Sequence, residues 1–113
     1  MNAYDIDAWL GDAEATDEQR AAIQAASDAI GARWPDPDMA DSRRDALNAA
    51  AMVTLGDETL EALAEAWRDA RAREQAARAA LTGAIIASGG TEVDLARRAG
   101  VTRMTVRKAL GKG

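Results

Sequence analysis

Apolar side chains recur at steps of three and four residues along most of this chain, a period typical of amphipathic α-helices. The pattern predicts a short helix near residues 5–10, a helix over 16–33, another over 41–55, and helical sequence from 58 to 88. No run shows the strict alternation of apolar and polar residues that indicates a β-strand. We therefore expect an all-α protein.

Local signals indicate where these helices begin and end. Thr16 is followed three residues later by Gln19, which has the form of a capping box. Gly56 is expected to end the third helix, because glycine enters the left-handed conformation that closes many helices. Asp57 is then expected to cap the fourth. The pattern leaves open whether residues 57–88 form one helix or two helices with a break near residue 75.

The end of the chain has the pattern of two short helices joined by a turn. Gly100 lies where the chain must turn, and Thr91 and Thr102 precede the two helical stretches and can cap them. Ala96 is small enough for one helix to cross the other. The positions expected to face inward are apolar: Leu95, Ala99, Val101, Val106, Ala109 and Leu110. This is a helix-turn-helix pattern, in which the second helix is free to enter the major groove of DNA.

The segment Gly-Val-Thr-Arg-Met-Thr-Val-Arg-Lys-Ala-Leu, residues 100–110, resembles the recognition helix of the GntR family of bacterial repressors. That family follows this helix with a β-hairpin wing, which we do not expect here because the sequence stops at Gly113. Together with the helical sequence before them, the two terminal helices are expected to form a three-helix unit. Its placement is similar to that in the Fis family of DNA-bending proteins and in small helix-turn-helix proteins of actinobacterial plasmids and phages. The GntR resemblance implies DNA contacts from Thr102, Arg103, Thr105 and Arg107.

Charge is distributed unevenly along the chain. Residues 91–113 carry a net charge of +4, whereas residues 1–90 carry −9, and the whole chain carries −5. A polyanion is attracted by residues 91–113 and repelled by residues 1–90. The charge distribution therefore favours DNA as the ligand of the helix-turn-helix.

Two kinds of DNA contact are expected from this module. Base contacts are expected from Arg103, Met104 and Arg107, since an arginine in the first turn can bond guanine O6 and N7 with about 1–3 kcal/mol of discrimination. Arg97 and Arg98 either reach the DNA backbone or pair with Asp94. The full set of expected backbone contacts is Thr91, Arg97, Arg98, Thr102, Thr105, Lys108 and Lys112.

Composition argues against several other classes of function. The chain has no cysteine and no histidine, so we expect no disulfide, no metal site and no catalysis by those side chains. Carboxylates are spread over helix faces and no phosphate-binding loop is present, so we expect neither a cofactor nor an enzyme. No apolar run is long enough to span a bilayer. We expect no membrane partner and a cytoplasmic, nucleoid-associated location.

Two hypotheses follow. In the first, the protein is a sequence-specific double-stranded-DNA-binding transcriptional regulator, with a DNA-binding module at residues 76–113 and an acidic helical region at 1–75 that dimerises or binds a partner. Alanine supplies 29 of the 54 hydrophobic residues, so the core is small and a homodimer is expected. Repression is the expected use, and Fis-like bending has the same layout. In the second, the protein is an antitoxin or a plasmid or phage accessory factor whose acidic helices bind a protein partner.

Overall fold

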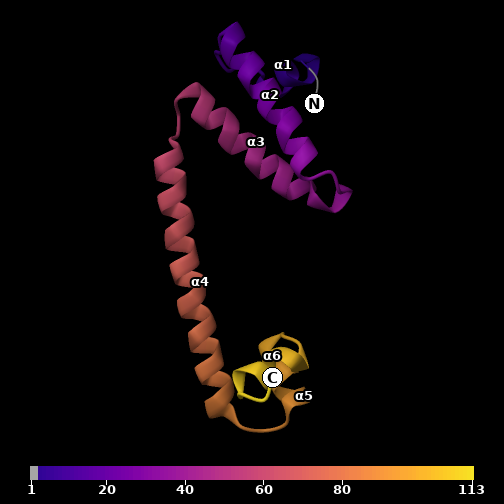
Figure 1. The fold of residues 1–113 in the computed structure, drawn as a ribbon, viewed down its shortest axis with the longest axis vertical. Coiled ribbons are helices and arrows are strands. Elements are labelled where there is room, and N and C mark those ends of the chain that lie inside the picture. Colours follow the sequence, from indigo (N-terminus) through magenta and orange to yellow (C-terminus); the bar gives the residue numbers. More distant parts are fainter. Residues whose placement is uncertain (1–2) are drawn as a thin grey trace. The chain divides into compact units, whose positions relative to one another are not determined.

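A computed structural model describes residues 3–113 and contains no β-strand in that range (Figure 1). The all-α prediction is confirmed. The elements are α1 (Ala3–Leu10), α2 (Asp17–Arg33), the 3-10 turn η1 (Pro37–Met39), α3 (Ala40–Leu55), α4 (Leu60–Ser88), α5 (Glu92–Ala99) and α6 (Arg103–Ala109). Contacts divide the chain into two compact units, and the boundary falls inside α4, between Ala64 and Glu65.

The first unit is built on the pair of α2 and α3, which run side by side, with α1 packed against α2 (Figure 1). Its buried apolar residues come from all three helices: Ile6, Ile23, Leu47 and Ala51, bordered by the partly buried Leu10, Ile30 and Leu55. Burial of each large aliphatic side chain contributes about 1.5–3 kcal/mol. An ion pair between Asp7 and Arg20 adds a polar link between α1 and α2.

The ends of α2 follow from local chemistry. Thr16 accepts from the backbone N–H of Gln19 at 3.1 Å, and the Gln19 side chain accepts from the Thr16 N–H at 2.8 Å, so the predicted capping box is confirmed. Beyond α2 the chain turns through η1. Arg43 holds this turn by donating from Nη1 to the carbonyls of Trp34 and Asp36, both at 2.6 Å.

The junction between α3 and α4 differs in one respect from expectation. Gly56 ends α3 with φ 86°, as predicted. Asp57 does not cap the next helix, because its backbone N–H donates to Met52 at 2.8 Å and still belongs to the end of α3. Thr59 takes the capping role, with its hydroxyl accepting from the N–H of Ala62 at 3.1 Å. The following helix, α4, is continuous as far as Ser88, so the segment is one helix rather than two.

The middle of α4 has no covering element in the structure. Every residue from Glu65 to Leu81 is exposed, including Trp67 at 60%. Local contacts are present, such as the guanidinium of Arg71 over the Trp67 ring at 4.9 Å. Isolated helices shorter than about 12–15 residues are marginal in water, and α4 is longer, with 29 residues. Within the structure this stretch is therefore held by its own local interactions rather than by tertiary packing.

The second unit packs the last turns of α4 against α5 and α6 (Figure 1). Ile85 of α4 is buried with Leu95, Ala96 and Val106, and Val106 is fully inaccessible. The other residues predicted to face inward are partly buried around this cluster: Ala99, Val101, Ala109 and Leu110. The sequence therefore predicted the inward faces of both terminal helices correctly.

Candidate nucleic-acid interface

The turn between α5 and α6 is built by a glycine between two threonine caps. Thr91 accepts from the N–H of Asp94 at 3.1 Å and begins α5. Gly100 closes α5 in the left-handed region with φ 69°. Thr102 then accepts from the N–H of Thr105 at 3.1 Å and begins α6. These local bonds set the ends of the two helices, and the buried cluster described above holds α6 across α5 in a helix-turn-helix, with one side of α6 buried and the other turned outward.

The outward side of α6 carries the three residues predicted to read bases. Arg103 and Met104 are exposed, at 61% of the side chain and 54% of the residue. Arg107 lies one turn farther along and is half-buried, with 37% of its side chain exposed. The two arginines thus share one face, but the Arg107 side chain is less exposed than that of Arg103.

Both arginines are held by one carboxylate that the sequence analysis did not single out. Glu92, the first residue of α5, accepts from Arg107 Nη1 with both carboxylate oxygens at 3.1 Å. Arg103 Nη2 donates to Glu92 Oε1 at 3.3 Å. Partial burial opposes ionisation, but the hydrogen bonds and positive charge of the two arginines outweigh it and hold the pKa of Glu92 below its usual value of 4.5.

The arginines of α5 are also engaged. Arg97 Nη2 lies 2.6 Å from Asp94 Oδ1, and Arg98 Nη1 lies 3.9 Å from Asp94 Oδ2. Both arginines therefore form the ion pair with Asp94, which was one of the two expected alternatives. Among residues 6–113, whose side chains the structure describes, Lys108 and Lys112 have no carboxylate within 4 Å. These two exposed lysines are therefore not engaged in an ion pair that an external anion would have to displace.

The threonines predicted to touch the DNA backbone already have roles within the fold. The hydroxyls of Thr102 and Thr105 lie 3.0 Å apart, and Thr102 also caps α6. Thr91 caps α5 in the same way. All three residues are exposed, so each hydroxyl can still accept or donate a further bond at the surface. Their contacts with DNA remain predictions.

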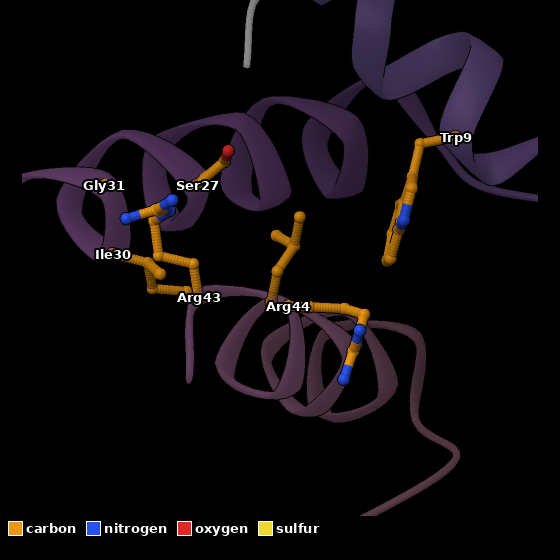
Figure 2. Close-up of a pocket in the computed structure, with 7 residues that line it drawn as sticks. Trp9, Ser27, Ile30, Gly31, Arg43 and Arg44 are labelled. Atoms are coloured by element: carbon orange, nitrogen blue, oxygen red, sulfur yellow. The ribbon is translucent and has the colours of Figure 1, made fainter. Parts of the chain in front are cut away.

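A hollow of about 240 Å³ lies in the first unit, between α2 and α3 (Figure 2). Trp9 stands at one side of it, and the Arg43 side chain reaches toward Ser27 and Gly31 at the other (Figure 2). Arg43 already donates to two backbone carbonyls, and Arg44 points away from Ser27 and pairs with acidic residues of its own helix (Figure 2). The arginines of this hollow therefore serve the fold, and the helix-turn-helix is the stronger candidate site.

The part of the chain that the structure describes contains no helix that is both long and apolar enough to cross a membrane. Over the same residues, no group of three or more acidic side chains is arranged to hold a metal ion. Comparison with protein-family models, with curated proteins and with solved structures gave no match to this chain, so the case for the interface rests on its own residues and geometry.

Proposed function

We propose that the protein is a sequence-specific double-stranded-DNA-binding regulator of transcription that acts as a repressor. Helix α6 enters the major groove, Arg103, Met104 and Arg107 contact base edges, and the surrounding threonines and basic side chains contact the DNA backbone. One observation carries this proposal. Two arginines, Arg103 and Arg107, lie together on the outer face of the second helix of a helix-turn-helix, each bonded to Glu92.

The charge of the terminal segment supports the same function. Residues 91–113 carry +4 in a chain whose net charge is −5. Such a segment attracts DNA, while the acidic remainder disfavours indiscriminate binding elsewhere on the surface. The affinity of a basic module for DNA falls as salt rises, with a log–log slope of about −0.9 per phosphate neutralised. A steep salt dependence is therefore expected.

We also propose that the regulator acts as a homodimer. A single small module buries too little surface for tight binding to DNA. The uncovered stretch of α4 supplies a surface for a second copy, since Trp67, Ala70, Ala77 and Leu81 lie on one heptad stripe, which Glu74 interrupts. Two modules related by a two-fold axis would read half-sites about one helical turn, or 34 Å, apart.

Affinity selection of sheared genomic DNA tests the proposal. The purified protein and its Arg103→Ala/Arg107→Ala variant are each incubated with the fragments at low and near-physiological salt, and the retained DNA is sequenced. We expect the wild type to enrich a motif with two-fold symmetry and the variant to lose it. An enriched site without symmetry would support DNA binding but contradict the dimer. No enrichment at either salt would contradict DNA binding itself.

The second candidate function is binding of a protein partner through the acidic helices, as in an antitoxin or an accessory factor. The net charge of −9 on residues 1–90 favours it, as do the exposed apolar side chains of Met52 and Val53 on α3. An acidic surface of this kind suits a basic protein rather than DNA. This function is the one to pursue if the DNA selection shows no enrichment.

A further inference from the structure

We propose that Glu92 is a positioning residue that determines specificity in the DNA interface. It orients Arg103 and Arg107 for contacts with bases and lowers their affinity for phosphates. The inference rests on the proposed function and adds a residue to it. It starts from an unusual placement, because a carboxylate at the edge of a DNA-binding surface opposes DNA unless it does something for the cations beside it.

The geometry leaves the arginines usable while it restrains them. Glu92 engages Nη1 of Arg107 and Nη2 of Arg103, one nitrogen of each guanidinium. A guanidinium carries five N–H donors in a planar fork, so donors remain on both side chains for the two acceptors of a guanine. Arg107 has one further weak contact, from Nη2 to the carbonyl of Lys112 at 3.4 Å.

Glu92 is itself well fixed. It is the first residue of α5, directly after the Thr91 cap, where the helix dipole favours a negative charge. Its side chain is only 17% exposed. Its pKa lies below the ordinary value of 4.5, so it stays ionised into more acidic solution than an ordinary glutamate. Because α5 is anchored through the buried Leu95 and Ala96, the carboxylate is a rigid reference point for two long side chains of α6. Restraint of those side chains before binding reduces the entropy lost on binding.

The same charge separates specific from non-specific complexes. A guanine edge can be approached with both arginines still on Glu92, so the base contact and the ion pairs coexist. A phosphate carries a full negative charge, so the Glu92 carboxylate repels it even where it could use the remaining donors of the arginines. Glu92 therefore penalises phosphate contacts more than base contacts, which widens the difference in affinity between the correct site and other DNA.

Asp94 provides a matched control in the same helix. It is also ionisable and lies near basic side chains, but its partners are Arg97 and Arg98 on α5, not the arginines of α6. Asp94→Asn and Glu92→Gln remove the same charge from the same helix. A general electrostatic effect changes DNA binding alike in both variants, whereas a positioning role is confined to Glu92.

The experiment measures the dissociation constants of wild type, Glu92→Gln and Asp94→Asn for the selected duplex and for a scrambled duplex of equal length. The ratio of the two constants is the specificity. We expect Glu92→Gln to bind the scrambled duplex more tightly and to lose about tenfold in specificity, the size of one good base contact. Asp94→Asn should change both constants by the same factor and leave the ratio within about twofold.

A third variant separates the effect of the carboxylate's position from the effect of its charge. NMR spectra test the restraint of the two arginines independently of DNA binding. Glu92→Asp keeps the charge but withdraws it from the arginines, so its specificity should fall while its scrambled-duplex affinity rises less than that of Glu92→Gln. Without DNA, the side-chain Nε–H NMR signals of Arg103 and Arg107 should move in Glu92→Gln and stay in place in Asp94→Asn. Thermal melts confirm that each variant is folded.

The outcomes are distinct. If the wild type prefers the selected duplex and Glu92→Gln keeps that preference, or loses it no more than Asp94→Asn does, the role of Glu92 is overturned and DNA binding stands. If the wild type prefers no duplex, the proposed function fails and the role of Glu92 in specificity fails with it. In that case the NMR reading still shows whether the carboxylate restrains the two arginines.

Discussion

Arg103 and Lys112 are both exposed and basic, but their surroundings assign them different roles. Arg103 lies in the first turn of α6 on a fixed carboxylate, whereas Lys112 lies beyond the end of the helix without a carboxylate partner among the described residues. We expect Arg103→Ala to remove about 1–3 kcal/mol of discrimination between sites. Lys112→Ala should weaken all duplexes equally and reduce the salt slope by about 1. Titrations of selected and scrambled duplexes at several salt concentrations check both. Small and equal effects from the two changes would contradict base reading by Arg103.

The ion pairs of Glu92 also give a pH dependence of stability. Its pKa in the folded protein lies below the ordinary 4.5, so its ion pairs contribute their full stabilisation above that pH. The contribution is lost as pH falls through the folded-state value, where the carboxylate becomes protonated. Thermal melts of wild type and Glu92→Gln between about pH 3 and pH 7 measure the effect. The wild type should be the more stable above the ordinary value, and the gap should close toward the acid end. A gap that is constant with pH would contradict the assignment.

Single residues also show what the sequence could and could not predict about the site. The roles of Thr91, Gly100 and Thr102 were predictable, because caps and left-handed turns depend on residue type and on spacings of a few positions. The role of Glu92 was not, because its partners lie 11 and 15 residues away and meet it only when α6 crosses α5. No periodic pattern encodes such a contact.

At the scale of elements, the helix-turn-helix depends on the left-handed residue between its helices. Gly100 has φ 69° with no atom near the position of a Cβ, so a side chain there meets backbone strain rather than a clash. We expect Gly100→Ala to lower the free energy of unfolding by about 1–2 kcal/mol. Denaturant titrations followed by circular dichroism give this quantity.

Gly83 provides the matched control for that change. It lies within α4 at an ordinary helical φ, and a Cβ there also meets nothing within 4 Å. Alanine is favoured over glycine inside a helix by up to about 1 kcal/mol, so Gly83→Ala should stabilise the protein. Equal effects from Gly83→Ala and Gly100→Ala would show that the left-handed turn does not constrain the motif.

Helix boundaries were predicted well where the sequence has a strong start or stop signal and less well elsewhere. Gly56 and the capping box at Thr16 act through their own backbone and nearest neighbours, so the sequence was sufficient. Asp57 was assigned as a cap because of its residue type, but the close of α3 uses its backbone N–H and the cap moves to Thr59. When two capping residues stand close together, the geometry of the preceding helix end decides between them.

At the scale of the whole molecule, the proposed homodimer depends on the exposed stretch of α4. If a second copy covers it, Trp67 supplies the largest apolar contact on the heptad stripe. We expect Trp67→Ala to shift the monomer–dimer equilibrium toward monomer by at least about tenfold, since loss of a large buried side chain at an interface costs about 2 kcal/mol or more. Sedimentation equilibrium over a range of protein concentrations measures this shift.

Ile86 provides the control that distinguishes a specific dimer interface from nonspecific hydrophobic association. It is exposed to the same degree as Trp67, 59% against 60%, and lies on the same helix but off the stripe. Ile86→Ala should leave the association constant within about twofold, because scattered surface apolar residues need no partner. If both substitutions weaken association equally, or the wild type is a monomer at all concentrations, this stripe of α4 is not the dimer interface.

If α6 reads DNA as proposed, the contacts of Glu92 with Arg103 and Arg107 have a consequence for redesign of the target sequence. Replacement of Arg103 or Arg107 by glutamine or asparagine, which can read adenine, would leave the carboxylate with one cation instead of two. Retargeting this module is therefore a three-position problem, in which residue 92 must change along with the two readers. Libraries that vary only α6 would keep a carboxylate beside readers that no longer neutralise it fully, whereas libraries that include residue 92 can give the new readers a neutral neighbour.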